Sequence, residues 1–311
     1  MAWFSSQFYA EGLEVPHPGA WGTVSSRHLR VMHSEMAYRH SQLEEQYVDA
    51  SKLPLPFISW VRFQDKTMLD SECVDHMAKT LCQAVGSRMG GVPGEAVSPL
   101  LQTSAEHASR FRVLGVLHAE SLRWTGLRGD IAPILRILVG KHNVDAAQNG
   151  RMDPFHHKIL LVLQTKGMHT SMLELTRPCN SGTAAKSTWS RCIYDTLDAS
   201  PSLDTDVHKG IHLLMVGTGL IRPKDRFKRT YPTPFIKQKD DTVCGLTTFI
   251  NLVQKLTGEA LDPVHWDLFV DLVRLFFDLW IFYLAESMGA IRPGCLPLES
   301  CSQEGENACC A

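Results

Sequence analysis

The feature that most constrains the fold is an apolar run near the C-terminus, between Val264 and Met288. Four of its charged residues recur at steps of four, three and four, so on a helix they form one narrow polar stripe. These residues are Asp267, Asp271, Arg274 and Asp278. A membrane span is excluded, because charged side chains at the centre of a bilayer cost about 2.5 to 3.5 kcal/mol each. The run therefore predicts a long apolar helix surrounded by protein, in the core or at a subunit interface.

Helical periodicity of apolar residues recurs along most of the chain. The expected helices cover residues 26–49, 70–85, 104–124, 131–139, 153–163, 183–197 and 204–216. Asp153 followed by Pro154 is a residue pair typical of a helix start. The alternation typical of strands is found only at 54–63 and 169–176. The predicted fold class is therefore all-α, with many helices in two lobes and irregular N- and C-terminal arms.

Turn-forming residues around Asn149 and Gly150 predict a boundary between the two lobes. The expected parts are an aromatic N-terminal arm at 1–24, an N-terminal lobe at 25–148, a C-terminal lobe at 149–289 and a mobile tail at 290–311. The arm contains Trp3, Phe4, Phe8, Tyr9 and Trp21 without helical or strand periodicity. Large aromatic side chains are costly to leave in water, so the arm is expected to dock on its own domain or on another subunit.

Composition indicates a folded protein in a reducing compartment. The 311 residues are 44% hydrophobic and 21% charged, which is ordinary for a globular chain and excludes wholesale disorder. The nine cysteines are an odd number, and most lie singly in apolar surroundings, so free thiols are expected. The N-terminus lacks a signal-peptide pattern. These features predict an intracellular protein, cytoplasmic or nuclear, and no residue pattern requires a cofactor.

Charge concentrates in one segment, residues 222–239, where seven Lys or Arg residues and one aspartate leave a charge of +6. The whole chain carries −2, so the remainder carries about −8. Three aromatic residues recur every four positions in the segment, and three prolines disfavour a helix. The residues expected to bind an anionic partner are Arg222, Lys224, Arg226, Phe227, Lys228, Arg229, Tyr231, Phe235, Lys237 and Lys239. Lys and Arg neutralise phosphates, and exposed aromatic rings stack on unpaired bases.

This pattern predicts a protein that binds single-stranded nucleic acid without sequence specificity, with RNA favoured over DNA. Self-association through the aromatic arm or the last helix would suit a nucleoprotein-like role. The first alternative is a structural subunit of a larger assembly, in which the basic segment meets an acidic protein surface. On either interpretation the chain is a binding protein rather than an enzyme, and a homo-oligomer or assembly subunit is expected.

A third interpretation depends on Gln238, Cys244 and His265. Cys244 begins an expected helix, whose positive end favours a thiolate, and a glutamine six residues earlier is placed to donate to an oxyanion. In these few residues the chain resembles papain-like cysteine hydrolases. The resemblance implies Cys244 as nucleophile, His265 as base and Gln238 as oxyanion donor. His265 departs from the pattern, because it follows an expected helix start rather than lying on a strand, and no orienting Asn or Asp is identified.

His208 and His212 lie four residues apart in the expected helix at 204–216, with Asp204 one turn earlier. This spacing suits a metal ion. In an H-E-x-x-H zinc peptidase the residue after the first histidine is the glutamate base, but here it is Lys209, so that mechanism is excluded. Histidines on a solvated helix face are the favoured interpretation, and a structural metal is the alternative.

Overall fold

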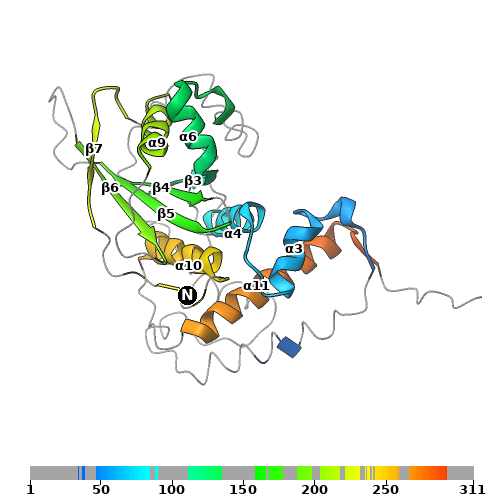
Figure 1. The fold of residues 1–311 in the computed structure, drawn as a ribbon. Coiled ribbons are helices and arrows are strands. Elements are labelled where there is room, and N and C mark those ends of the chain that lie inside the picture. Colours follow the sequence, from blue (N-terminus) through cyan, green and yellow to red (C-terminus); the bar gives the residue numbers. More distant parts are fainter. Residues whose placement is uncertain are drawn as a thin grey trace, which may run out of the picture.

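A computed structural model describes a little over half of the chain, in separate segments. The described residues are 34, 37–38, 47–84, 88–89, 111–134, 158–165, 168–177, 188–197, 204–217, 221–231, 235, 237–238, 240, 242–258 and 266–292. Within them, a mixed β-sheet lies between two groups of helices, which makes a three-layer α/β fold (Figure 1). The predicted all-α fold class is therefore wrong.

The central sheet has six strands in the order β2-β3-β4-β5-β6-β7. Their bounds are Arg88–Met89 (β2), Phe111–His118 (β3), Lys158–Gln164 (β4), Thr170–Thr176 (β5), Thr188–Asp195 (β6) and Arg226–Arg229 (β7). Strands β2, β3 and β4 are parallel, β5 is antiparallel to both of its neighbours, and β7 is parallel to β6. Strands β3 and β4, which pair with one another, lie on either side of the expected lobe boundary at residue 148.

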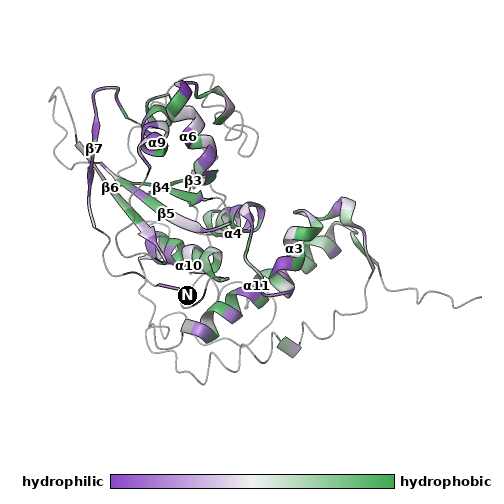
Figure 2. Cartoon of the chain, viewed as in Figure 1, coloured by the Kyte–Doolittle hydropathy of each residue, from purple (hydrophilic) through white to green (hydrophobic). Residues whose placement is uncertain are grey.

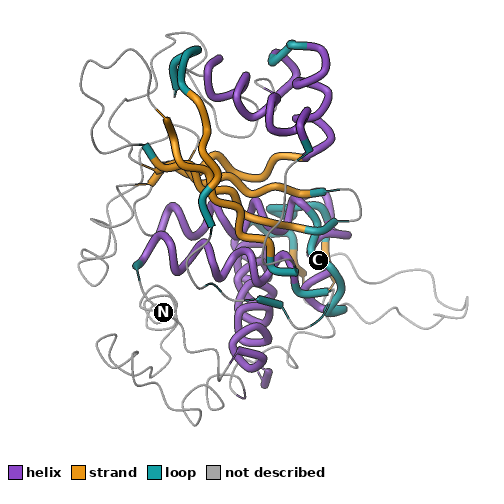
Figure 3. Tube along the Cα trace, turned by 60° about the vertical axis from the view of Figure 1, so that its left-hand side comes forward, coloured by secondary structure: helices purple, strands orange, loops and turns teal. Residues whose placement is uncertain are grey.

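Helices α6 (Ala119–Arg128) and α9 (Thr205–Gly217) cover one face of this sheet (Figures 1 and 3). Their backbones touch at two glycines. A Cβ atom at Gly126 would collide with the carbonyl oxygen of Asp206, and one at Gly210 would collide with the carbonyl oxygen of Leu122. Only glycine permits this separation of the two helix axes, because any side chain would fill the contact.

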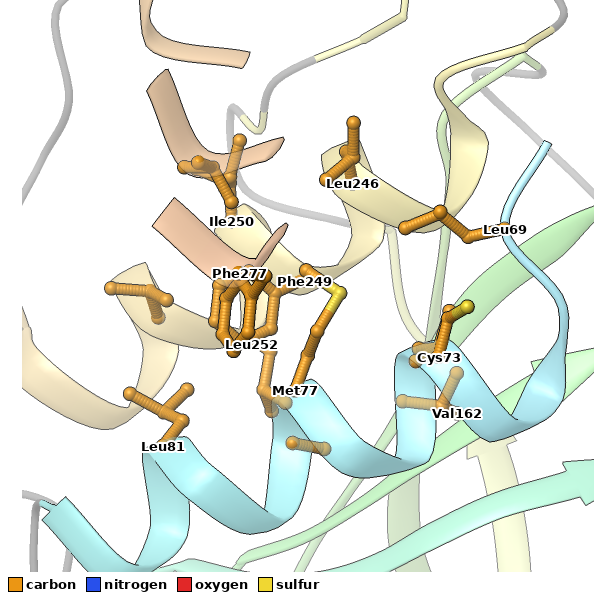
Figure 4. Close-up of a cluster of buried hydrophobic side chains, with 14 of the residues drawn as sticks. Leu69, Cys73, Met77, Leu81, Val162, Leu246, Phe249, Ile250, Leu252 and Phe277 are labelled. Atoms are coloured by element: carbon orange, nitrogen blue, oxygen red, sulfur yellow. The ribbon is translucent and has the colours of Figure 1, made fainter. Parts of the chain in front are cut away.

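The other face of the sheet is covered by α4 (Ser71–Ala84) and α10 (Cys244–Thr257). Helices α3 (Phe57–Gln64) and α11 (Trp266–Ser287) pack beyond them, and Figure 2 shows the green apolar positions of α10 turned toward its neighbours. In the close-up of this core, Met77 lies against Phe249 and Phe277 (Figure 4). The last two rings meet edge to face, with centroids 5.2 Å apart. Burial of aromatic and aliphatic side chains of this kind supplies most of the stabilisation of a core.

Strands buried on both faces explain why the sequence was misread as helical. In β4, Leu160 and Val162 point into the core beside α4 and α10, while Ile159 and Leu161 point into the core beside α6 and α9. Such strands read as continuous apolar runs, which periodicity does not distinguish from a buried helix. Three expected helices therefore contain strands. They are 104–124, which contains β3 followed by α6, 153–163, which contains β4, and 183–197, which contains β6.

The residues expected to form a long apolar helix form α11, in which part of the polar stripe is buried. Arg274 donates from Nη1 to the carbonyl oxygens of Arg62 at 3.0 Å and Thr67 at 3.3 Å. Asp278 accepts a hydrogen bond of 2.6 Å from Trp60 Nε1. The stripe therefore binds α3 and the loop after it, so α11 is a mixed core helix. No helix among the described residues has the length and apolar character needed to cross a bilayer.

A short two-stranded sheet joins segments far apart in the sequence. Strand β1 (Tyr47–Val48) pairs antiparallel with β8 (Ile291–Arg292), and the 3-10 helix η2 (Ala50–Lys52) follows β1. The backbone N–H of Asp49 also donates to the carbonyl oxygen of Ala290 at 2.6 Å. The start of the described core is thus tied to the end of α11. The stretch 54–63, expected as a strand, lies largely in α3 instead.

Candidate active site

Cys244 is the first residue of α10, where the helix begins after a tight turn. The carboxylate of Asp240 accepts hydrogen bonds from the backbone N–H of Thr242 at 2.8 Å and from its hydroxyl at 2.6 Å. These two hydrogen bonds fix the turn that leads into α10. Cys244 is fully buried and has a free thiol. Its sulfur therefore lies at the positive end of the helix dipole, which favours negative charge there.

His169 and Asp195 are brought together by the pairing of two strands. His169 immediately precedes β5, and Asp195 is the last residue of β6, opposite Ser171 in the antiparallel register. The imidazole Nε2 of His169 lies 2.9 Å from Asp195 Oδ1, and the two side chains are 21% and 17% exposed. Asp195 also accepts a hydrogen bond of 3.0 Å from the backbone N–H of Leu197. Both bonds are made by the same carboxylate oxygen, Oδ1, which fixes its position beside the imidazole.

The turn between β4 and β5 fixes the position of His169. Thr165 donates from its backbone N–H to the carbonyl oxygen of His169 at 2.8 Å, and Met168 donates back to Thr165 at 3.1 Å. Met168 has a φ of 66°, in the left-handed region that a residue with a side chain seldom adopts. Strained backbone conformations of this kind gather at functional sites.

His169 also contacts Cys244. The Cys244 thiol donates to the carbonyl oxygen of Met168 at 3.6 Å, which places it beside the residue before the histidine. The pKa of His169 is raised from 6.5 to about 10, first by its hydrogen bond with Asp195 and second by a hydrogen bond with the Cys244 side chain, against the opposing effect of burial. The Asp195 carboxylate therefore stabilises the protonated imidazole of His169.

Gln238 lies at the same edge of the sheet. Its backbone N–H donates to the carbonyl oxygen of Thr196 at 3.2 Å, and its side-chain carbonyl accepts a hydrogen bond from the Thr196 hydroxyl. Thr196 directly follows Asp195, so the glutamine is anchored next to the orienting carboxylate. One N–H of the side-chain amide donates to Asp240 O at 2.7 Å, and a carboxamide has a second N–H to offer.

The structure thus gathers Cys244, His169, Asp195 and Gln238 at one end of the sheet. This set contains a thiol, a histidine beside it, a carboxylate bonded to that histidine and an amide donor. Together they have the composition needed for nucleophilic attack on an acyl group. His265, the base implied by the papain-like resemblance, lies outside the described residues.

The sequence analysis missed His169 and Asp195. One signal for the histidine was present, because it opens the stretch 169–176, one of the two with strand alternation. A strand is also where the papain-like pattern places its histidine. Asp195 gave no such signal, since the stretch around it was interpreted as a helix, and a helix would have turned the residue away from β5.

The histidines expected on a helix face, His208 and His212, lie on α9, on the opposite face of the sheet from α10. His208 Nδ1 is hydrogen-bonded to the Arg191 guanidinium, and His212 Nε2 bonds Asp225 O at 3.0 Å. Burial, followed by the charge of Arg191, lowers the pKa of His208. Among the residues that the structure describes, no group of three or more His, Cys, Asp or Glu side chains is placed to hold a metal ion.

The basic segment does not form a base-stacking surface. Phe227 packs against His208 and His212, with ring centroids 5.5 and 5.8 Å apart, and Phe235 packs edge to face on Tyr194. Of the three aromatic residues only Tyr231 is exposed, at 72%. Since stacking on bases needs several open ring faces, the prediction of a nucleoprotein-like RNA-binding protein is wrong.

The cations of that segment are distributed along a strand and the loops beside it. Arg222 pairs with Asp225 at 3.2 Å, and Arg229 lies over the ring of Tyr231. Exposed positions are held by Lys224, Arg226, Lys228 and Lys237, whereas Lys239 lies outside the described residues. The segment is therefore a charged sheet edge rather than an irregular loop.

The fold and the gathered residues define an α/β protein with a cysteine–histidine–aspartate constellation at one end of its sheet. No protein-family model matches the sequence, and no curated protein is similar to it in sequence. Among solved structures, the chain is similar to the SUMO protease Ulp1 with its catalytic cysteine oxidized to a sulfinic acid. The identity is 10% and the TM-score 0.46, over 88% of this chain and 99% of that chain.

Two further structures are similar at comparable identity. The C-terminal Ulp1 protease domain in complex with Smt3, the yeast ortholog of SUMO, has 11% identity and a TM-score of 0.47, over 83% of this chain and 95% of that chain. The central domain of Lpg1148 from Legionella pneumophila has 14% identity and a TM-score of 0.32, over 72% and 98%. These neighbours include cysteine protease domains, but likeness at this level does not by itself assign an activity to the chain.

Proposed function

We propose that the protein is a cysteine hydrolase in which Cys244 attacks an acyl carbon. The observations that carry this proposal are that the His169 imidazole lies 2.9 Å from Asp195 and that the Cys244 thiol bonds the carbonyl oxygen of Met168, the residue before this histidine, at 3.6 Å. A nucleophile, a base bonded to it and a third group that orients the base are the arrangement that activates a weak nucleophile. The third interpretation of the sequence, a cysteine hydrolase, is thus supported with a different histidine.

The proposed reaction begins with Cys244 as thiolate and His169 as imidazolium. Attack of the sulfur on the acyl carbon forms a tetrahedral oxyanion, and His169 then gives its proton to the leaving group. In the second half of the reaction His169 removes a proton from water, which attacks the thioester carbon and releases the acid. Asp195 stabilises the imidazolium of His169. By binding Nε2, it also orients the ring so that Nδ1 is free to exchange a proton with the reacting groups.

Two donors are proposed for the oxyanion. The backbone N–H of Cys244 belongs to the first turn of α10, where backbone N–H groups have no partner within the helix. The second donor is the Gln238 amide, which hydrogen bonds with Thr196 and Asp240 hold at this edge. Removing a single donor of this type typically slows acyl transfer by about 100- to 1000-fold.

Site-resolved alkylation with iodoacetamide at neutral pH tests the proposal without a known substrate. The thiolate is the reacting species, so Cys244 should be alkylated faster than Cys73, which is equally buried in the same protein. Mass spectrometry of the digested protein gives both rates in one experiment. Equal rates, or a slower rate at Cys244, would refute the proposed nucleophile.

A panel of amide, ester and thioester substrates then tests hydrolysis itself. The expected result is an acyl group attached to Cys244 in rapidly quenched samples, and turnover that disappears in Cys244→Ala. Cys192→Ala is the matched control, because Cys192 is also a buried free thiol but lies on β6 away from His169. Turnover that survives Cys244→Ala would exclude the mechanism.

A further inference from the structure

Strand β7 is an edge strand of the central sheet. Within the described part of the chain it pairs with β6 on one side only, from Thr188 opposite Arg226 to Arg191 opposite Arg229. Figure 1 shows it at the left-hand margin of the sheet. An edge strand presents backbone N–H and C=O groups that can pair with another extended chain.

The side chains of this edge are strongly basic. Arg226 and Lys228 on β7 are exposed, as are Lys224 before the strand and Lys237 after it. These four cations form no ion pair with another described residue, whereas Asp225, the only acid of the segment that the structure describes next to them, is buried and bonded to Arg222 and Trp189. The positive charge of the edge is therefore left for an external partner.

The edge also offers one open aromatic ring. Tyr231 is 72% exposed, and the guanidinium of Arg229 lies 5.5 Å from its ring centroid. Tyrosine and arginine are enriched in protein–protein interfaces, where a rigid ring adds contact area at low entropic cost. With a single exposed ring, this edge lacks the succession of stacking faces that a nucleic acid strand requires, and the observations favour a polypeptide partner.

We infer that the β7 edge binds an extended acidic polypeptide segment by strand addition. Backbone hydrogen bonds to β7 would supply part of the affinity, and carboxylates of the segment would meet Arg226, Lys228, Lys224 and Lys237. Charge complementarity of this kind steers association and selects the partner. The occupant is thus defined by an extended backbone and repeated negative charge.

The position of the edge gives the binding a further consequence. After β7 the chain continues along β6, with Thr230 N bonded to Arg191 O at 2.8 Å and Gln238 N bonded to Thr196 O at 3.2 Å. The four-residue step from Arg191 to Asp195 spans about 13 Å at about 3.3 Å per residue. An extended polypeptide bound at β7 would therefore need only about four more residues to reach the candidate active site. The binding itself does not depend on the proposed catalysis.

Fluorescence anisotropy with a labelled peptide tests this inference. The peptide alternates glutamate with valine or threonine, and the protein is the full chain carrying Cys244→Ala, so that loss of activity has no influence on the result. Binding should weaken as salt is added. Charge reversal by Arg226→Glu with Lys228→Glu should weaken binding at least about tenfold, because two attractive contacts become repulsive.

The matched control carries Lys52→Glu with Lys66→Glu, which changes the net charge equally at exposed positions far from β7. This variant should bind as the parent does, and thermal unfolding of both double variants should show that they are folded. Equal weakening in both variants, or unchanged binding after reversal at β7, would overturn the inference, as would no binding at low salt.

Backbone methylation of the peptide separates strand addition from charge attraction alone. In a paired strand only alternate N–H groups point to the neighbouring strand, so N-methylation of one alternate set should abolish binding and methylation of the other set should preserve it. Equal effects of the two sets would overturn strand addition. An RNA oligomer that binds more tightly than the acidic peptide would assign the edge to nucleic acid and overturn the inference.

Discussion

Two cysteines of this protein, Cys73 and Cys244, occupy similar positions but differ in the groups around the sulfur. Both are fully buried, and both lie in the first turn of a helix, α4 and α10. The thiol of Cys73 donates to Ser59 O at 3.0 Å beside Asp70. Burial, and then the negative charge of Asp70, raise its pKa. The neighbour of Cys244 is the imidazole of His169 instead.

The comparison shows that helix position and burial do not decide the chemistry of a thiol. A helix N-terminus favours the thiolate at both sites, but the nearest charged side chain has the opposite sign in the two. A carboxylate next to Cys73 disfavours negative charge on that sulfur, whereas the charged group nearest to Cys244 is the imidazolium of His169. Exchanging or removing those neighbours is therefore the direct way to test the difference.

The largest effect is expected from His169→Gln. Without the imidazole, alkylation of Cys244 at neutral pH should slow by about 100-fold or more, the usual contribution of a positioned base. Alkylation of Cys73 in the same sample should not change, because His169 does not contact it. If Cys244 reacts at the original rate, the imidazole does not activate it and the contrast between the two thiols has another origin.

A smaller effect is expected from Asp195→Asn. The amide keeps the shape of the carboxylate but removes the charge that stabilises the imidazolium of His169. The alkylation rate of Cys244 should fall by about 10- to 100-fold, and a plot of the rate against pH should show the protonated form of His169 lost at lower pH than in the parent. An unchanged pH profile would mean that Asp195 has no electrostatic influence on the pair.

Stability should depend on pH through the same histidine. The pKa of His169 is raised in the folded protein to about 10 from 6.5, so its contribution is complete below pH 6.5 and is lost as the pH rises through 10. In urea unfolding, the difference between parent and His169→Gln should be about 1 to 3 kcal/mol at the lower pH and should vanish at the higher one. A difference that is independent of pH would contradict this account.

The smallest effect is expected at the other cysteine. Asp70 accepts a hydrogen bond of 3.0 Å from the backbone N–H of Cys73 and so caps α4. Asp70→Ala should lower the free energy of unfolding by about 1 kcal/mol through loss of this cap. Cys73 should still be alkylated more slowly than Cys244, because burial is the first cause of its raised pKa. If Cys73 in Asp70→Ala is alkylated as fast as Cys244, the carboxylate of Asp70 alone suppresses the reactivity of Cys73.

Part of the candidate site could be predicted from the sequence. Gln238 and Cys244 lie six residues apart in one segment, so their relation is local and visible in the sequence. His169 and Asp195 reach them only through the pairing of β5 with β6 and the packing of α10 on that sheet, which no local pattern reports. The papain-like resemblance implied the histidine 21 residues after Cys244, whereas the histidine that the fold places beside Cys244 precedes it by 75 residues.

The fold shows the same limit. Helices α4 and α9 were predicted close to their bounds, because each has one buried and one polar face. Strands β3, β4 and β6 were assigned to helices. For β4 the reason is that helices cover both faces of the sheet and leave no polar side to alternate with, whereas β6 carries polar residues without a strict alternation. The wrong assignment of β6 also hid Asp195, so it contributed to the wrong fold class and removed one residue of the candidate site.

The glycine contact between α6 and α9 has a consequence on the far side of the sheet. The backbones of α6 and α9 are in contact at Gly126 and Gly210, so the two helices pack as one rigid layer. Helix α9 is in turn joined to β6 by the hydrogen bond between His208 and Arg191. The position of Asp195, the last residue of β6, therefore depends on two residues that have no side chain. Alanine at either glycine should displace α9, and with it the carboxylate of Asp195 in the adjacent layer.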